Sequence, residues 1–267
     1  MFSGYIGDNT INTSLSSAGF TLDLEDIPAY GCYRMFRNTS VAKGPKFANL
    51  KSIGNYGLAQ AFQVCRNLVN GPKFPNLTSI GYHGLEYAFN ACSSLTSVEL
   101  PSTPISVGFY GCRNAFSKSG IKTVENLNLS GIGQYGCEGM FLSCAYLEKV
   151  DGLSAESLSA YALSGMFANC SSLTSVQDLY IDNSEDKNNK LSKCDSMFYN
   201  CNSLLSVGGL IKGLYGQRQL RYMFRNCKSL KDASKLSVEV NNGIYYAQQM
   251  FDDCSELESM PVLLSGK

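Results

Sequence analysis

The sequence predicts an α/β repeat fold, a solenoid of about nine units in which each unit contributes one short helix and one short strand. Three observations support this prediction. The phrase "MFANCSSLTSV" recurs with small changes along the chain, its apolar residues keep fixed columns, and most copies end in a β-branched residue near a glycine or proline. Units that cannot bury an apolar face alone must stack on their neighbours, as solenoid repeats do.

A phenylalanine anchors every unit of the repeat. Successive anchors are 26, 27, 27, 25, 26, 31, 26 and 27 residues apart. The repeat domain is therefore predicted over residues 27–267, and residues 1–26, which fit no full unit, are predicted to cap the first one. The nine anchors, which we expect in the core, are Phe36, Phe62, Phe89, Phe116, Phe141, Phe167, Phe198, Phe224 and Phe251.

A short helix is predicted around each anchor. Apolar or small residues occupy the positions four before, one before, at and three after the phenylalanine. At about 100° per residue these positions share one face of a helix. The column three after the anchor, also expected in the core, holds Cys65, Cys92, Cys144, Cys170, Cys201, Cys227 and Cys254, with Thr39 and Ser119 in the two remaining units.

A short strand is predicted after each helix. Stretches such as "SLTSVEL" (94–100) and "SLLSVGGL" (203–210) combine β-branched residues with a following turn residue. The single long spacing holds the polar segment "IDNSEDKNNK" (181–190), which is typical of an exposed loop inserted into one unit.

The composition argues against several classes of partner. The chain has 22 basic and 22 acidic residues, and only 16% of its residues are charged. This balance gives no electrostatic basis for binding nucleic acid or an anionic membrane. No run reaches the roughly 18 to 20 apolar residues of a membrane span, so we expect no membrane insertion, and the first residues lack the pattern of a signal peptide.

The eleven cysteines are interpreted as buried free thiols that pack as small apolar side chains. Cys137 and Cys144, like Cys194 and Cys201, are seven residues apart, about 10 Å on a helix, which is too far for a disulfide. Disulfides between units stay an open alternative. No C-x-x-C spacing suggests a metal site, so neither a metal nor another cofactor is expected.

A mostly aromatic column lies six residues before the anchor. If it faces solvent, it forms a stripe suited to stacking on sugars or packing against a protein. The alternative is that these residues lie half-buried in a turn and serve the fold. His83 is interpreted as a substituted tyrosine of this column, because no nucleophile is tied to it by a known spacing. The candidate stripe comprises Tyr30, Tyr56, His83, Tyr110, Tyr135, Tyr161 and Tyr245.

The recurring Met-Phe-x-x-Cys-x-x-Leu pattern, over roughly residues 27–264, resembles the BspA-like leucine-rich repeat family. The variants "YGCYRMF", "YGCRNAF" and "YGCEGMF" resemble repeat proteins of gut bacteria and their phages. This resemblance implies a leucine-rich-repeat-like solenoid and a surface-displayed, non-catalytic binding or adhesive protein.

The leading functional hypothesis is a non-enzymatic recognition or adhesion module on a bacterial cell surface or a phage virion, binding a protein or a glycan. The initial Met and the missing signal peptide favour the virion. The alternative is a structural assembly protein of a phage particle, such as a tail or capsid appendage, which self-associates through its C-terminal repeat unit. An enzyme is disfavoured, because the sequence shows no constellation of acid, base and nucleophile.

Overall fold

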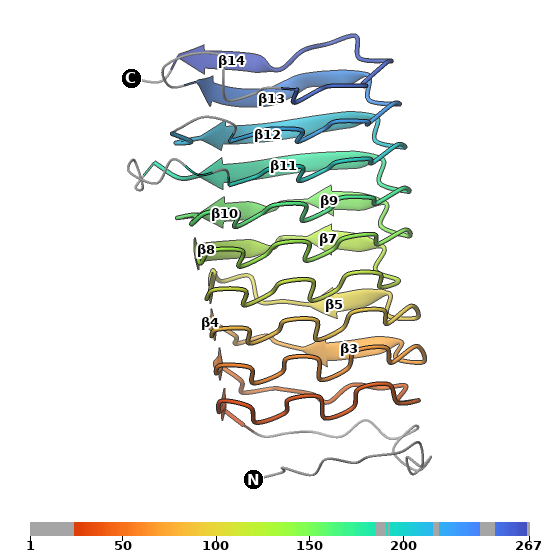
Figure 1. The fold of residues 1–267 in the computed structure, drawn as a ribbon, viewed down its shortest axis with the longest axis vertical. Helices are drawn as coiled ribbons and strands as arrows, with labels where there is room; N and C mark the ends of the chain where they lie inside the picture. Colours follow the sequence, from red (N-terminus) through yellow and green to blue (C-terminus); the bar gives the residue numbers. More distant parts are fainter. Residues whose placement is uncertain (1–23, 185–190, 192, 216–218, 241–248, 266–267) are drawn as a thin grey trace.

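The computed structural model describes residues 24–184, 191, 193–215, 219–240 and 249–265. Over these residues the chain forms an all-β parallel solenoid, a straight column of stacked turns of chain that we call rungs, each holding one anchor phenylalanine (Figure 1). The described residues contain no helix. The prediction of an α/β fold with a short helix in every unit is therefore wrong, whereas a leucine-rich-repeat-like solenoid fits the structure.

One wall of the solenoid, the strand wall, consists of parallel strands. The main sheet follows the order β1-β2-β4-β6-β8-β10-β11-β12-β13-β14, β7 and β9 extend it beside β11, and β3 and β5 form a separate pair. The strands are β1 (Asp26–Ile27), β2 (Ser52–Ile53), β3 (Asn70–Lys73), β4 (Ser79–Ile80), β5 (Ser97–Glu99), β6 (Ile105–Val107), β7 (Thr123–Glu125), β8 (Asn128–Ile132), β9 (Lys149–Asp151), β10 (Ser154–Glu156), β11 (Ser175–Asp182), β12 (Ser206–Lys212), β13 (Asp232–Val240) and β14 (Val262–Ser265).

The opposite wall, the turn wall, holds the segments that the sequence predicted as helices. Successive N–H groups alternate, so that one donates a hydrogen bond within its own rung and the next donates one to the neighbouring rung. In the first rung the N–H of Tyr33 donates to the carbonyl oxygen of Tyr30, three residues back, while the N–H of Arg34 donates to Ala59 of the next rung. A helix would instead bond every N–H to the residue four back. The turn wall is thus a chain of β-turns stacked like parallel strands.

Every fourth residue of the turn wall has a left-handed backbone with φ between 51° and 64°. These residues lie six before, two before and two after the anchor, as Tyr110, Asn114 and Lys118 do around Phe116. The backbone therefore repeats every four residues rather than every 3.6. At a period of four, the positions four before and at the anchor share one direction, and those one before and three after it share another. Both directions point inward, so the predicted apolar columns are buried although the predicted helix is absent.

The spacing of the rungs explains why no helix forms. Anchor rings of neighbouring rungs stack with centroids 5.1–5.4 Å apart. This distance is close to the 4.7–4.9 Å between strands of a sheet, whereas a helix with its side chains is about 10 Å wide. Helices stacked behind this sheet would have to fan out. A turn wall with the same rise as the strand wall lets the column stay straight (Figure 1).

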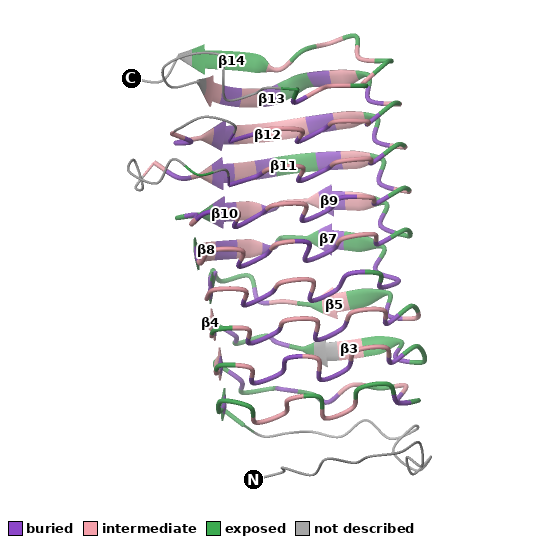
Figure 2. Ribbon diagram, viewed as in Figure 1, coloured by how far each residue is buried: buried purple, intermediate pink, exposed green. Residues whose placement is uncertain are grey.

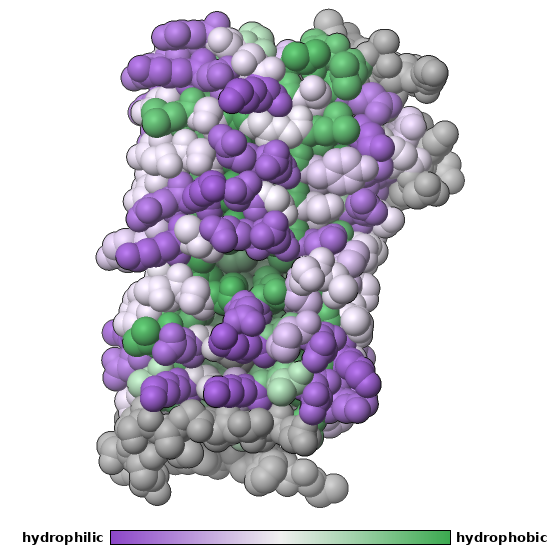
Figure 3. Space-filling view, turned by 180° about the vertical axis from the view of Figure 1, so that it is seen from behind, coloured by the Kyte–Doolittle hydropathy of each residue, from purple (hydrophilic) through white to green (hydrophobic). Residues whose placement is uncertain are grey.

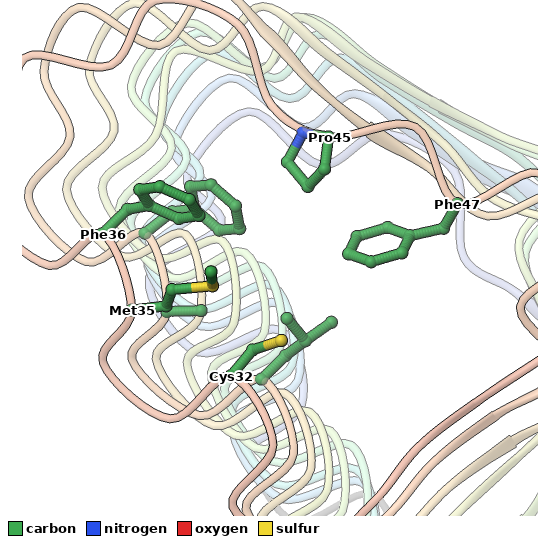
Figure 4. A pocket seen from close by; sticks show the side chains of 8 residues that line it. Cys32, Met35, Phe36, Pro45 and Phe47 are labelled. Carbon is green, nitrogen blue, oxygen red and sulfur yellow. The ribbon is translucent and has the colours of Figure 1, made fainter. Parts of the chain in front are cut away.

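The anchor rings form a continuous ladder through the core. All of them except Phe36 and Phe251, at the two ends, are fully buried. Figure 2 shows buried stretches in the rungs, alternating with intermediate and exposed ones. Figure 4 shows the first rung, where Cys32, Met35 and Phe36 of the turn wall point across the interior toward Pro45 and Phe47. Phe47 stacks in turn on Phe74, which belongs to the equivalent "GPKF" segment of the next rung.

Glycines allow close approach where the strand wall turns into the turn wall. A Cβ atom on Gly108 would lie 2.9 Å from the carbonyl carbon of Gly81, and one on Gly133 would lie 2.7 Å from that of Gly108. These distances are shorter than side-chain carbon atoms tolerate. The recurring glycine of the "IG-x-Y-G" phrases is thus required by the contact between rungs.

Candidate functional site

The aromatic column lies at the start of the turn wall and forms a second ring ladder. Six of its seven predicted members stack face to face or tilted from rung to rung, with centroids 4.6–5.1 Å apart. Tyr245 lies outside the described residues. The stacked members, called the aromatic ladder below, are Tyr30, Tyr56, His83, Tyr110, Tyr135 and Tyr161.

Ladder residues begin each turn wall with a left-handed backbone and are half-buried, apart from the exposed Tyr30 at the first rung. Further rings extend the ladder sideways. Tyr82, which is 42% exposed, stacks on Phe109 and meets the His83 ring edge-on. Tyr33 meets Tyr30 in the same way. The sequence analysis singled out the column of the ladder, whereas the flanking rings were missed. Tyr82 and Phe109 share the column seven before the anchor and Tyr33 lies three before it, but neither column is aromatic in the other described rungs.

The surroundings of the ladder change the pKa of one of its tyrosines and hold its histidine in place. Burial, a hydrogen bond with Tyr82 and the negative charges nearby raise the pKa of Tyr56 to about 12. His83 stacks on Tyr56 with centroids 4.6 Å apart, and its Nδ1 lies 2.5 Å from Glu86 Oε2. The imidazole is thus a ladder ring held by a carboxylate.

A column that is mostly charged from the third rung on, called the charged column below, runs beside the ladder, three residues before each anchor. Arg113 lies between two carboxylates of the neighbouring rungs, with Nη1 3.7 Å from Glu86 Oε1 and Nε 2.9 Å from Glu138 Oε2. Its guanidinium also lies over the ring of Tyr110, 4.7 Å from the centroid. In chain order the described members of this column are Tyr33, Ala59, Glu86, Arg113, Glu138, Ser164, Asp195 and Arg221.

A solvent-open groove of about 390 Å³ crosses the turn wall around the sixth rung. The column two before the anchor, filled by side chains in most other rungs, holds glycine at Gly139 and Gly165, and a Cβ on Gly165 would meet only the Cβ of Ala168, 3.9 Å away. We call this opening the rung-six groove. Its lining residues are Asn114, Tyr135, Glu138, Gly139, Leu142, Tyr161, Ser164, Gly165, Asp195 and Ser196.

Both carboxylates of the groove are partly desolvated. Burial raises the pKa of Glu138, and Arg113 only partly offsets this. Burial likewise raises the pKa of Asp195, against a hydrogen bond from Ser196 and the charge of Arg221. Ser164 lies on the rung between them, and its hydroxyl oxygen is buried and has no hydrogen-bond partner within the described part of the chain. The groove therefore offers acceptors that favour a donor or a positive charge.

The cysteine column three residues after the anchor faces the core, and its thiols bond to the backbone. Cys92 Sγ donates to the carbonyl oxygen of Phe62, the anchor of the preceding rung, at 3.0 Å. Desolvation raises the pKa of Cys92 to about 12 and that of Cys144 to about 11. Such thiols stay protonated, which suits a hydrogen-bond donor and not a nucleophile or a metal ligand. The structure holds all eleven cysteines as free thiols.

Within the described residues, no three histidine, cysteine, aspartate or glutamate side chains group closely enough to hold a metal ion. The same residues include no helix with the length and hydrophobicity of a membrane span.

A search of solved structures found matches to leucine-rich repeat proteins. A leucine-rich repeat protein from Bacteroides ovatus ATCC 8483 matches with 19% identity and a TM-score of 0.40, over 91% of this chain and 65% of that one. The T. pallidum leucine rich repeat protein matches with 16% identity and a TM-score of 0.30, over 96% and 85% of the two chains. A leucine rich cell surface protein from Faecalibacterium prausnitzii A2-165 matches with 14% identity and a TM-score of 0.30, over 93% and 80%. The chain thus spans less than two thirds of the Bacteroides ovatus protein.

A comparison with curated proteins found no match. The family model "BspA type Leucine rich repeat region", which contains six copies of the repeat, matches residues 25–149 and 51–208. These two matches together cover more than half of the chain and most of the rungs described above. The resemblance seen in the Met-Phe-x-x-Cys-x-x-Leu pattern is thereby confirmed, and the chain belongs to the BspA-type leucine-rich repeat family.

Proposed function

We propose that this protein is a non-enzymatic recognition module that binds a partner protein or a glycan through the aromatic ladder of its turn wall. The observation that carries the proposal is the row of six stacked rings along the surface. Because each ring is already held by its neighbours, little side-chain entropy is lost on binding. Aromatic side chains with polar tips are also the residues that protein and sugar interfaces favour.

Stacking decides which parts of the ladder a ligand can reach. Inner rings cover each other's faces, so they present edges and hydroxyl groups. Exposed tyrosines such as Tyr30 and Tyr82, 59% and 42% accessible, offer more surface. A partner that lies along the column would therefore contact many rings lightly, with stronger contacts at the first rungs.

The experiment starts with ligands selected on the wild-type protein from a peptide display library and a glycan array. Binding is then measured for a variant that combines Tyr30→Ala with Tyr82→Ala. The matched control is Tyr146→Ala, which removes a 62% exposed tyrosine that is not part of the ladder. Loss of binding in this variant, which removes one ladder ring and one ring that flanks the ladder, but not in the control supports the proposal. Unchanged binding in that variant, or the absence of any selected ligand, contradicts it.

The proposed setting is a bacterial cell surface or a phage virion, and the support for it is the resemblance of the repeat variants to proteins of gut bacteria and their phages. Antibody labelling of intact cells and of purified phage particles from the source tests it. Label on either supports the setting, and label confined to the interior of lysed cells contradicts it.

A second candidate function is structural assembly through the C-terminal rung. Strand β14 pairs with β13 and, among the described residues, with no other strand. Its rung carries the exposed apolar side chains Met260, Val262, Leu263 and Leu264, and Figure 3 shows hydrophobic residues gathered at this end. Figure 2 likewise shows β14 as exposed. An unpaired apolar edge strand favours addition of another strand.

Light scattering at several protein concentrations under reducing conditions tests this second candidate. An oligomer that dissociates when Leu263 is changed to glutamate, but not when the exposed Leu205 on another rung is changed in the same way, supports assembly through β14. A monomer at all concentrations contradicts it.

A further inference from the structure

From the third rung to the eighth, the charged column beside the ladder alternates in sign, with one interruption. From the third to the fifth rung it holds Glu86, Arg113 and Glu138, and on the seventh and eighth rungs it holds Asp195 and Arg221. Alternation requires a base on the sixth rung, between Glu138 and Asp195. That position is occupied by Ser164.

Arg113 shows what an arginine does in this column. It bridges the carboxylates of the two neighbouring rungs and lies over the ring of Tyr110 in its own rung. Such a site combines charge-assisted contacts on both sides with a cation–π contact. The molecule therefore contains one filled example of a guanidinium site between two acidic rungs.

The sixth rung has the same surroundings without the arginine. Glu138 and Asp195 lie two rungs apart, as Glu86 and Glu138 do, which is about 9–10 Å at the spacing of a sheet. Tyr161 has the place that Tyr110 has beside Arg113. The absent side chain of Gly165 and the small Ser164 leave open the space that a guanidinium would fill, and this space is the rung-six groove.

We propose that the rung-six groove binds an arginine side chain on an exposed segment of a partner protein, whose guanidinium lies between Glu138 and Asp195. The inference deepens the proposed recognition function and rests on it. No basic side chain lines the groove. Ser164 lines the groove, and its hydroxyl oxygen has no hydrogen-bond partner among the described residues.

A neutral sugar is the competing ligand for a groove lined by carboxylates and tyrosines. The alternating column favours arginine, because two acids flank a position that is basic elsewhere. Stacked faces of Tyr135 and Tyr161, with centroids 5.1 Å apart, also leave little ring face for a sugar to cover.

The test uses N-acetyl-arginine amide as the probe and N-acetyl-citrulline amide as its uncharged counterpart of nearly equal shape. Binding is followed by NMR chemical-shift titration of the full chain. We expect resonances of the groove residues to shift with the arginine probe, and at least tenfold weaker binding of the citrulline probe. Equal binding of both probes, no shift with either, or groove shifts only with neutral oligosaccharides would overturn the proposal.

Two variants locate the site. Asp195→Asn removes one charge with little change of shape, and Ser164→Arg places an arginine of the chain itself in the groove. We expect at least fivefold weaker probe binding for the first and no detectable binding for the second, together with a higher melting temperature for Ser164→Arg. Tyr146→Arg, the control, adds the same charge at an exposed site and leaves binding and melting temperature unchanged. If the arginine probe bound Ser164→Arg as it binds the wild type, the proposed site in the rung-six groove would be wrong, whether or not the ladder-dependent ligands still bind.

Failure of this inference is distinguishable from failure of the proposed function. The two experiments use different variants, since the ladder substitutions leave Ser164 and Asp195 in place. Ladder-dependent ligands without arginine binding would reject the groove alone. Arginine binding without ladder-dependent ligands would reject the ladder as the main recognition surface.

Discussion

The thiol of Cys92 donates a hydrogen bond to the main-chain carbonyl oxygen of Phe62, which lies in the preceding rung 3.0 Å away. The same carbonyl accepts the N–H of Cys65 within its own rung. Equivalent bonds connect the cysteine of one rung to the anchor of another along the column, for example Cys201 to Phe167 and Cys254 to Phe224. Cysteine in this column thus combines an apolar body with a donor directed at the neighbouring rung.

Substitutions of Cys92 test whether the donor matters. Serine keeps a donor, whereas alanine removes it and leaves a small cavity. We expect Cys92→Ser to lower the free energy of unfolding by less than Cys92→Ala, with both losses about 1–2 kcal/mol. Urea denaturation under reducing conditions measures them. If packing alone mattered, alanine would be the better replacement, so a more stable Cys92→Ala protein would reject the role of the thiol as a donor.

Position along the anchor ladder determines the cost of losing a ring. Phe167 is fully buried and stacks on rings above and below, while Phe251 is half-buried and stacks on Phe224. We expect Phe167→Ala to cost about 3–5 kcal/mol of the free energy of unfolding and Phe251→Ala about half as much. Chemical denaturation of both variants gives the comparison. Equal losses would mean that the end rung is packed as tightly as the centre.

Gly108 lies where the strand wall turns into the turn wall, and the neighbouring rung leaves no room there for a Cβ. Gly131 differs, because only its positive φ favours glycine. A Cβ at Gly108 would meet backbone atoms of Gly81 and Tyr82, whereas one at Gly131 would meet nothing within 4 Å. We expect Gly108→Ala to lower the free energy of unfolding by about 2–3 kcal/mol. Gly131→Ala, which strains only a positive φ of 53°, should cost about 1 kcal/mol. Similar losses for the two variants, measured by urea denaturation, would show that the rungs separate readily at the corner.

The sequence predicted the solenoid, its period and its inward-facing columns, because buried positions repeat whatever the backbone between them does. It did not predict the turn wall. Positions four before, one before, at and three after the anchor fall on one face at a period of 3.6 and equally at a period of four. A distinguishing signal was present in the left-handed positions, where Asn114, Gly139, Gly165 and Asn169 are residues that tolerate positive φ. Tyrosine, valine and lysine in the same columns masked that signal.

The candidate site was predictable only in part. The aromatic ladder follows from the repeat, since its members share a column. The rung-six groove does not, because it depends on side chains missing from two columns in adjacent rungs. Gly139, Gly165 and Ser164 stand out in the sequence only once the four-residue period of the turn wall is known.

The insertion after β11 begins at a carboxylate that is held by several partners. Asp182 accepts hydrogen bonds from Ser184 and Tyr180, and its Oδ2 lies 3.0 Å from Lys212 Nζ. Burial raises the pKa of Asp182, but the bonds from Ser184, Lys212 and Tyr180 outweigh burial and lower the pKa to about 2. Residues 185–190 of the insertion lie outside the described residues, so these contacts mark where its described part ends.

A lowered pKa makes the stability contribution of Asp182 depend on pH. The folded protein binds its proton less tightly than the unfolded chain, so the contribution is fully present above about pH 4 and is lost as the pH falls through about 2. Because the groups are partly exposed, we expect Asp182→Asn to cost about 1 kcal/mol at pH 7. Urea denaturation at pH 7, 4, 3 and 2 should show wild type and variant converging at low pH. Glu125→Gln, an exposed substitution on β7, serves as the control. A constant difference between wild type and Asp182→Asn at every pH would show that Asp182 acts through shape and not through its charge.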